Sequence, residues 1–194
     1  MPVATELALA TFVDLVALGD VRAEIIGGEI VEKAAPTMEH GSSQAALSGY
    51  LHRRFNRRPG GRWPGGWWIG TEVDVEYEAH EIYRHDVVGW RRGRVPERPT
   101  KRPIRIRPDW VCEILSPSNE KRDLVDKMQT LHRSGVAHYW ILNPEERVLV
   151  VHRHQEDGYL VALTASSGDT VRAEPFEDVE LRVGVLFGDE DEDE

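Results

Sequence analysis

RPDWVCEILSPSN, residues 107–119, is the stretch that decides the fold, because one carboxylate, Glu113, interrupts its apolar run from Trp110 to Leu115. This run is apolar on both faces, so residues 107–116 predict a central strand that is buried on both sides of a sheet. Residues 119–134 then predict a helix with one apolar face, and residues 138–143 predict a second strand. This strand–helix–strand order is typical of a crossover unit, so we expect two parallel strands in one sheet.

The rest of the chain alternates shorter helices and strands around this unit. Residues 7–18 and 37–58 carry apolar side chains at helical spacing, and Gly27-Gly28 joins two strand-like runs into a hairpin across residues 22–33. Four further segments have the apolar pattern of strands: residues 67–77, 81–90, 147–154 and 159–164. We therefore expect an α/β fold with a central mixed β-sheet flanked by helices, preceded by an N-terminal helix and hairpin.

Length and composition indicate one folded domain. A chain of 194 residues fits a single domain, which we expect over residues 1–187, and 40% apolar residues supply its core. The single cysteine, Cys112, excludes an internal disulfide framework and a cysteine-based zinc site. No apolar run approaches the roughly 18 residues of a membrane span, and the N-terminus lacks a secretory pattern. A cytoplasmic protein without a membrane segment is the simplest expectation.

The net charge of -10 argues against nucleic-acid binding, but the charges are unevenly distributed. The last six residues are all acidic, and we expect residues 188–194 to form a disordered acidic tail. Residues 84–107 hold nine Arg or Lys and only two acids, and residues 53–62 hold five Arg and no acid. These basic stretches can follow a phosphate backbone, although solvated loops and helix faces explain them equally well.

Glu113 is the carboxylate that interrupts the buried strand. A buried carboxylate is costly unless it pairs with a cation or coordinates a metal, so a salt bridge and a metal site are both open. Asp109 lies about 13 Å away along the same strand, too far to share a metal ion with ligand distances of about 2.0–2.6 Å. Asp86 interrupts a second strand-like segment, IYRHDVVGW, and is the better partner.

Four further positions complete the candidate set. Lys127 lies on the helix that follows the buried strand directly, although an ordinary ion pair with Asp123 on the same helix is the alternative. Glu39 is a candidate additional metal ligand, although the helix dipole alone explains an acid in the first turn. His40 and His85 are weaker candidates, because no histidine spacing typical of zinc sites accompanies them.

Four stretches taken together resemble one known family. In chain order they are AEIIGGEIVEKAAPTMEHG, GWWIGTEVDVEYEAHEIYRHDVVGWRRGRVP, PDWVCEILSPSN and KRDLVDKMQTLHRSGVAHYWILNP, within residues 12–187. They resemble the restriction endonuclease family of the Uma-two type. The resemblance implies a PD-(D/E)XK nuclease with a restriction-endonuclease-like core. It places the metal-binding acids on Asp86 and Glu113, the lysine on Lys127 and a helix acid on Glu39.

Two positions depart from the family pattern. His85 stands where many members have proline, and Leu115 stands where the usual motif has its lysine. The resemblance therefore implies that the lysine has moved to Lys127. Fold follows from a family resemblance more strongly than activity does, because activity depends on the site.

The expected function is hydrolysis of DNA phosphodiester bonds with Mg²⁺ or Mn²⁺. Asp86, Glu113 and the backbone carbonyl of Ile114 would hold the metal, which polarises the phosphate and activates a water molecule. Lys127 would orient that water or stabilise the charge of the transition state.

Other interpretations stay open at this stage. One alternative is a catalytically silent nucleic-acid-binding or accessory protein that keeps the nuclease fold, and another is hydrolysis of a different phosphate ester. A homodimer would suit double-strand cleavage by symmetry. The candidate phosphate contacts are Arg91, Arg92 and Arg94.

Overall fold

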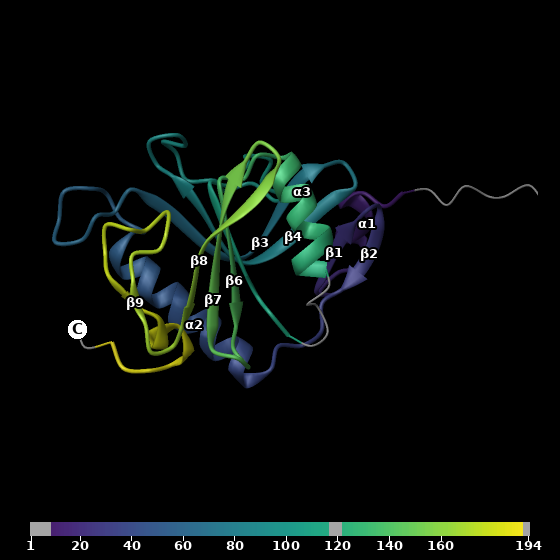
Figure 1. Cartoon of the computed structure of the whole chain (residues 1–194). Helices are drawn as coiled ribbons and strands as arrows, with labels where there is room; N and C mark the ends of the chain where they lie inside the picture. Colours follow the sequence, from purple (N-terminus) through teal and green to yellow (C-terminus); the bar gives the residue numbers. More distant parts are fainter. Residues whose placement is uncertain (1–8, 117–121, 192–194) are drawn as a thin grey trace, which may run out of the picture.

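The structure, a computed structural model, describes residues 9–116 and 122–191 and is built on one mixed β-sheet (Figure 1). The strand order is β2-β1-β4-β5-β6-β7-β8, with β3 paired to β4. β5 and β6 run parallel, as expected for the crossover unit, and the other neighbouring pairs in this sheet are antiparallel. The strands are β1 (Ala23–Ile26), β2 (Glu29–Glu32), β3 (Trp67–Glu78), β4 (Glu81–Arg91), β5 (Trp110–Ile114), β6 (His138–Asn143), β7 (Val148–Gln155) and β8 (Gly158–Ser166).

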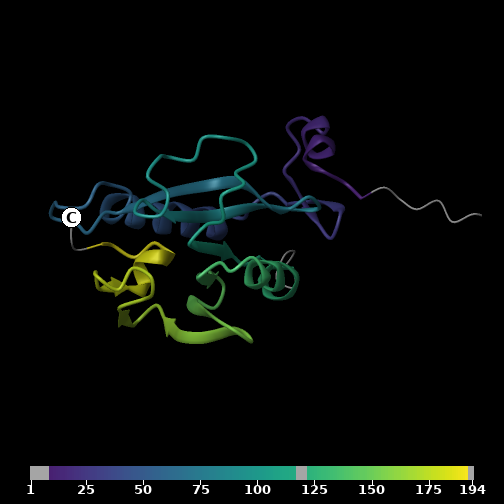
Figure 2. The same cartoon turned by 90° about the horizontal axis from the view of Figure 1, so that it is seen from above.

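Helices cover both faces of this sheet (Figures 1 and 2). Buried side chains of α2 join a core cluster that includes Trp110, and those of α3 join a second cluster that includes Val111, the next residue of β5. Since successive side chains of a strand point to opposite faces, the two helices lie on opposite sides of the sheet. No helix in the described ranges has the length and apolar character to cross a membrane. The remaining elements are α1 (Phe12–Ala17), α2 (Met38–Arg54), the π-helical turn Arg122–Lys127, α3 (Met128–Arg133), β9 (Thr170–Val171), β10 (Leu181–Arg182) and the 3-10 turn Val183–Phe187.

Local sequence explains the elements that border the site. Thr37 caps α2 by accepting a hydrogen bond from the N–H three residues later at 3.2 Å. Leu47 and Leu51 follow at helical spacing and are fully buried. Gly27 and Gly28 turn the β1–β2 hairpin with φ of 58° and 81°, which glycine adopts without the steric cost of a Cβ. The predicted hairpin and long helix are confirmed, as is the mixed sheet flanked by helices.

One predicted helix begins later than the sequence pattern indicates, and the predicted start of another lies outside the described residues. The helix predicted over residues 7–18 is described from Phe12, and residues 1–8 lie outside the description. Residues 117–121, which hold the start of the helix predicted at 119, also lie outside it. The described part begins as a π-helical turn at Arg122, becomes α-helical at Met128 and ends before Gly135, whose φ is 72°.

The C-terminal residues up to Asp191 contact the body of the protein. Asp189 forms an ion pair with Arg147 at 2.8 Å, and Asp191 forms one with the buried Arg54 at 2.9 Å. Residues 192–194 of the predicted acidic tail lie outside the described part of the chain. The division into a domain and a disordered tail at residues 187 and 188 stays a prediction.

One edge of β4 is shared by two different strands. β3 pairs along the whole of the other edge, so β1 and β5 must both use this one. β1 pairs at Ile82, and β5 pairs over residues 87–89. Residues 83–86 lie between these pairings, and we refer to them as the split edge.

Side chains replace a neighbouring strand along the split edge. Glu24 accepts a hydrogen bond from the Arg84 N–H at 2.8 Å, and Lys33 donates one to the Arg84 carbonyl at 2.8 Å. Gln44 donates to the carbonyl of Asp86 at 2.9 Å. Because buried main-chain groups must be paired, the split edge gathers polar side chains inside an apolar sheet.

Candidate active site

Asp86 lies at the end of the split edge and is fully buried. Its Oδ2 accepts a hydrogen bond from the N–H of Ile114 at 2.8 Å, which ties it to the end of β5. Its Oδ1 lies 2.9 Å from Nζ of Lys33 and 3.6 Å from Nε2 of His40 in α2. Burial alone would raise the pKa of Asp86, but His40 and the charge of Lys33 hold that pKa well below its usual range. Asp86 is therefore an ionised carboxylate at neutral pH.

Glu113 is the second buried carboxylate, and it follows directly from the β4–β5 pairing. Val87 pairs with Cys112, so Asp86 and Glu113 are the next residues of the two strands. Oε1 of Glu113 lies 2.6 Å from Nδ1 of His85 and 3.3 Å from Nζ of Lys127. Oε2 is buried and has no hydrogen-bond partner among the described residues. Such an unpaired buried oxygen requires an explanation, and an absent ligand is one.

Glu113 ionises less readily than an ordinary glutamate. Burial and the neighbouring charge of Asp86 raise its pKa to about 8, although Lys127 acts in the opposite direction. The two carboxylates of the site therefore differ in their affinity for a proton. A cation that binds between them must displace the proton from Glu113.

Lys127 joins the site from the turn that leads into α3. Its ammonium group lies 2.9 Å from Oε1 of Glu24 on β1, in addition to its contact with Glu113. The side chain is 1% exposed, so its charge depends on these acids rather than on water. The side chain of Asp123, the partner in the alternative interpretation, lies outside the described residues. Lys127 does reach Glu113, as a functional role requires.

His85 connects Glu113 to a tyrosine. Its Nε2 lies 2.7 Å from the hydroxyl of Tyr77, and its Nδ1 contacts Glu113. Burial and the nearby Lys127 lower the pKa of His85 to about 3, so the ring is neutral. When Glu113 is ionised, Nδ1 must donate to it, and Nε2 then accepts from Tyr77. His85 therefore holds the orientation of Glu113.

The two carboxylates fit a hard divalent cation. Within the described residues, no group of three or more His, Cys, Asp or Glu side chains is arranged to hold a metal. Mg²⁺ does not need such a group, because it is bound through one or two carboxylates and keeps several waters. Asp86 is ionised, and Glu113 offers the unpaired Oε2. The donor set therefore fits Mg²⁺ or Mn²⁺ and does not fit a three-ligand zinc site.

Glu39 does not join this cluster. Its side chain is exposed in the first turn of α2, whereas the next residue, His40, faces Asp86. Glu39 lines a pocket of about 590 Å³ with Leu115 and Ser116, which directly follow β5, and with the turn after β6. The pocket lies at the carboxyl ends of the two parallel strands, where ligands of open α/β sheets commonly bind. A metal-binding role for Glu39 stays a prediction.

The candidate phosphate contacts differ in how they are held. Arg94 forms a two-pronged ion pair with Asp109, at 2.7 and 3.0 Å. Asp109 also accepts a hydrogen bond from the Arg91 N–H at 2.7 Å. It therefore holds the end of β4 and the loop after it, and it is not a member of the carboxylate pair. The guanidinium groups of Arg91 and Arg92 instead lie over tryptophan rings.

Sequence reasoning missed several members of the cluster. Lys33 follows the hairpin directly, and no local pattern separates it from a solvated lysine. Glu24 sits in a strand-like run, AEII, as the same kind of buried acid as Glu113, and this signal could have been used. Tyr77 and Gln44 carried no signal, because their roles depend on which strands and helices meet at the split edge.

The chain matches a family model described as "Uma2: Putative restriction endonuclease" over residues 9–184. Its structure is similar to a crystal structure from Anabaena variabilis, described as "a putative nuclease belonging to DUF820", with a TM-score of 0.72 and 20% sequence identity. This similarity covers 92% of this chain and 97% of the other, and at such low identity it supports the fold alone. No curated protein matches the chain. Because the family model covers most of its length, the chain belongs to the Uma2 putative restriction endonuclease family.

Proposed function

We propose that this protein is a metal-dependent endonuclease that hydrolyses DNA phosphodiester bonds. The observation that carries the proposal is the buried carboxylate pair of Asp86 and Glu113, which occupy neighbouring positions on two central strands with lysines beside them. Burying two carboxylates in the middle of a sheet costs free energy, because each charge must be compensated, so a pair without a function is not expected there. Family membership supports a nuclease function of this kind.

Asp86 and Glu113 would hold Mg²⁺ or Mn²⁺, with the carbonyl of Ile114 as a proposed third protein ligand. The bound metal would polarise the scissile phosphate and lower the pKa of an attacking water. His85 would keep Glu113 oriented through its Nδ1 hydrogen bond. Lys127 would orient the water or stabilise the negative charge that develops on the phosphate.

Lys33 has a separate part in this proposal. In the metal-free protein its ammonium group neutralises Asp86 at 2.9 Å. Burial alone would lower the pKa of Lys33, but the charge of Asp86 raises it, so the group stays protonated. Beside the proposed metal ligand Asp86, the Lys33 ammonium would be positioned to contact a substrate phosphate. The pocket that Glu39 lines, next to the end of β5, is the proposed approach for the DNA.

Cleavage of plasmid DNA tests the proposal. Purified protein is incubated with supercoiled plasmid and Mg²⁺ or Mn²⁺, beside Asp86→Ala and Glu113→Gln variants and an EDTA control. We expect nicked or linear DNA from the wild type with metal and none from the variants. Equal cleavage by all three proteins, or none by the wild type across DNA and RNA substrates, would refute the assignment. Sedimentation of the same samples tests the proposed homodimer.

A catalytically silent nucleic-acid-binding protein is the second candidate, and one observation favours it. Both carboxylates already have an ammonium partner, Lys33 for Asp86 and Lys127 for Glu113. A site neutralised by its own lysines has less need of a metal. Calorimetric titration with Mn²⁺ separates the two candidates, because only the nuclease requires binding that Asp86→Ala abolishes.

A further inference from the structure

Two groups can be distinguished among the arginines of the described residues, with Arg53 and Arg182 in neither of them. Most form ion pairs with acids, and these are Arg22, Arg54, Arg84, Arg94, Arg102, Arg105, Arg133, Arg147, Arg153 and Arg172. A second group has no ion pair with an acid in the described part of the chain: Arg57, Arg58, Arg62, Arg91, Arg92, Arg98 and Arg107. All but the last of these come from three segments, which are the end of α2 with the loop after it, the end of β4, and the loop after β4. In a chain with net charge -10, such clustering of uncompensated arginines is unexpected.

Arg92 is the arginine of the second group whose side chain is held by the most contacts. Its Nε donates to the carbonyl of Trp67 at 2.8 Å, and its guanidinium lies 3.5 Å from the ring centroid of Trp68. Backbone and aromatic contacts thus hold the side chain without neutralising its charge. Arg91 lies over the ring of Trp67 in the same way, at 4.6 Å.

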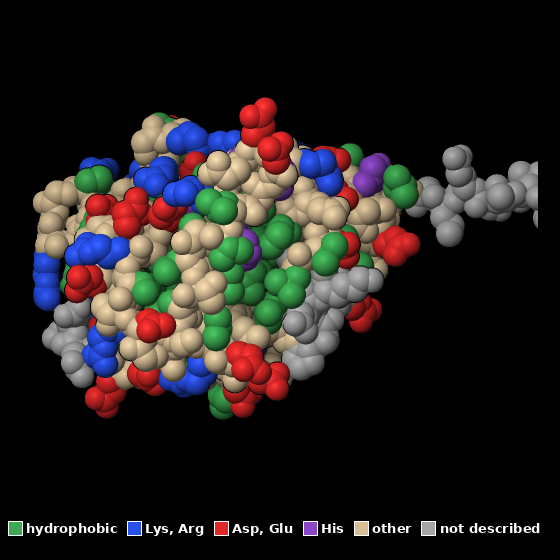
Figure 3. Space-filling model, in the orientation of Figure 1, with side chains coloured by type: hydrophobic (Ala, Val, Ile, Leu, Met, Phe, Trp, Pro, Cys, Tyr) green, Lys and Arg blue, Asp and Glu red, His purple; other side chains and the backbone are tan. Residues whose placement is uncertain are grey.

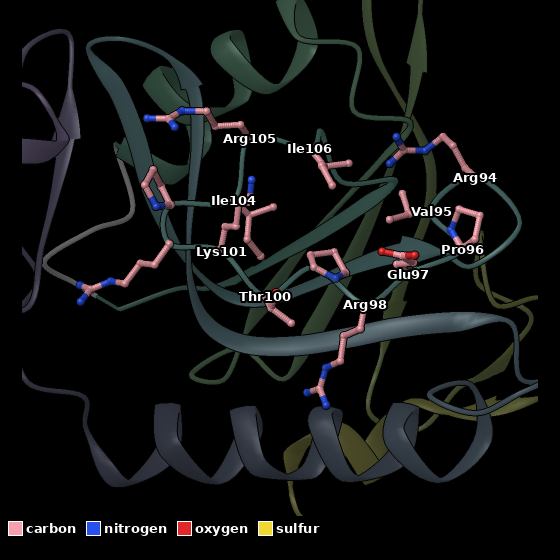
Figure 4. A pocket seen from close by; sticks show the side chains of 13 residues that line it. Arg94, Val95, Pro96, Glu97, Arg98, Thr100, Lys101, Ile104, Arg105 and Ile106 are labelled. Atoms are coloured by element: carbon pink, nitrogen blue, oxygen red, sulfur yellow. The ribbon is translucent and has the colours of Figure 1, made fainter.

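Arg58 and Arg98 come from two other segments near Arg92. The N–H of Arg92 donates to the carbonyl of Gly66 at 2.8 Å, and the N–H of Gly66 donates to the carbonyl of Arg57 at 2.7 Å, so the loop that holds Arg58 lies beside Arg92. Burial and then the charges of Arg58 and Arg98 lower the pKa of Arg92. Figure 4 shows Arg98 extending from its loop toward α2. It also lines the pocket of about 980 Å³ formed by residues 94–106. Figure 3 shows Lys and Arg side chains on the left of the molecule with Asp and Glu side chains among them.

The helix dipole explains only part of the cluster. Cations near a helix C-terminus are favourable, which accounts for basic residues at the end of α2 and just beyond it, such as Arg58. It does not account for Arg91, Arg92 and Arg98, which come from β4 and the loop after it. Like charges held together cost free energy unless an anion compensates them, so the arrangement favours an anionic ligand.

We propose that Arg58, Arg92 and Arg98, with Trp68 beneath Arg92, form an arginine patch that binds the phosphate backbone of duplex DNA at a distance from the carboxylate pair. This inference rests on the proposed nuclease function. The patch lies beyond the C-terminal end of α2, and the site lies near its N-terminal end at His40. The helix between His40 and Arg54 is about 21 Å long at 1.5 Å per residue. DNA that reaches both would span about six base-pair steps of 3.4 Å.

The patch changes the set of phosphate contacts inferred from sequence. Arg92 remains, and Arg58 and Arg98 join it. Arg94 does not belong to the patch, because its guanidinium group already forms a two-pronged ion pair with Asp109. A phosphate oxygen would need to compete with a carboxylate for Arg94, whereas no acid of the described residues forms an ion pair with Arg58, Arg92 or Arg98.

Binding of a labelled duplex tests the patch in the absence of metal. Fluorescence anisotropy with a duplex of about 20 base pairs is measured in EDTA over a series of salt concentrations for the full-length chain. The test variant is Arg58→Gln/Arg98→Gln, and the matched control is Arg147→Gln/Arg172→Gln, which removes the same charge from arginines paired with acids. We expect at least a tenfold loss of affinity for the test variant and less than a threefold loss for the control. The salt dependence of the test variant should be shallower by about two ions, since each phosphate contact contributes about 0.9 to the slope.

Two further measurements make the result decisive. Arg58→Lys/Arg98→Lys keeps the charge and should restore most of the binding, and the thermal midpoints of the Arg58/Arg98 variants should match that of the wild type because both arginines are exposed. Equal affinities of the test and control variants, or no duplex binding by the wild type, would overturn the patch. Plasmid cleavage is scored separately: a wild type that binds through the patch but does not cleave refutes only the proposed activity.

Discussion

The role of Lys127 as the common counter-ion of two buried acids leads to a sharp stability prediction. In Lys127→Met the side chain keeps much of its volume but loses the ammonium group between Glu24 and Glu113. Breaking a buried ion pair by removing one partner costs about 3–5 kcal/mol, because the other charge stays buried without compensation. With a urea slope of about 2–3 kcal/mol per molar for a domain of this size, the unfolding midpoint should fall by roughly 1–2 M.

The loss of stability caused by Lys127→Met should increase as pH rises. Glu113 has a folded-state pKa of about 8, above its unfolded value of 4.5, so the stability it contributes is present at low pH and is lost as pH rises through 8. Lys127 lowers that pKa, and its removal raises it further. At pH 6 Glu113 is protonated in both proteins, whereas at pH 9 only the wild type can stabilise the ionised form. The deficit of Lys127→Met should therefore be larger at pH 9 than at pH 6.

Urea unfolding followed by tryptophan fluorescence at the two pH values measures this deficit. Lys101→Met is the matched control, since Lys101 is exposed and its substitution should change stability by less than about 0.5 kcal/mol. The slope of the transition should stay constant, which shows that both proteins unfold in the same way. A deficit equal to that of the control, or one that shrinks as pH rises, would contradict the buried network described for Lys127.

Three further outcomes follow from the same contacts. Because Mn²⁺ must displace a proton from Glu113, calorimetry in buffers of different ionisation enthalpy at pH 7 should show proton release by the wild type and none with Glu113→Gln. His85→Ala should weaken Mn²⁺ binding by about 10–100-fold, and Tyr77→Phe by less, because each removes a contact that orients Glu113; unchanged affinities would show that neither orients it. Asp191→Asn should lower the free energy of unfolding by about 1–3 kcal/mol, since it leaves Arg54 with weaker compensation, and chemical denaturation measures this.

Much of the fold could be predicted because its determinants are local. The β1–β2 hairpin depends on two adjacent glycines, and α2 depends on its Thr37 cap and a regular apolar stripe. The pairing of β5 with β6 follows from a buried strand, a helix and a second strand in succession. The late start of β5 at Trp110 was not predictable, because Asp109 is held by Arg94, which lies 15 residues earlier. Such contacts depend on where a loop folds back.

The sequence by itself determined that Glu113 is a costly carboxylate in a central strand, and that Asp86 is the acid able to stand beside it. Those conclusions need only strand geometry and the energetic cost of burying a charge. Tertiary structure alone decided what surrounds the pair. β4 gives one edge to both β1 and β5, and the interval between them admits Glu24 and Lys33 from the hairpin and Lys127 from the crossover unit. No local pattern encodes that interval, because it exists only when the hairpin and the crossover unit meet on the same strand.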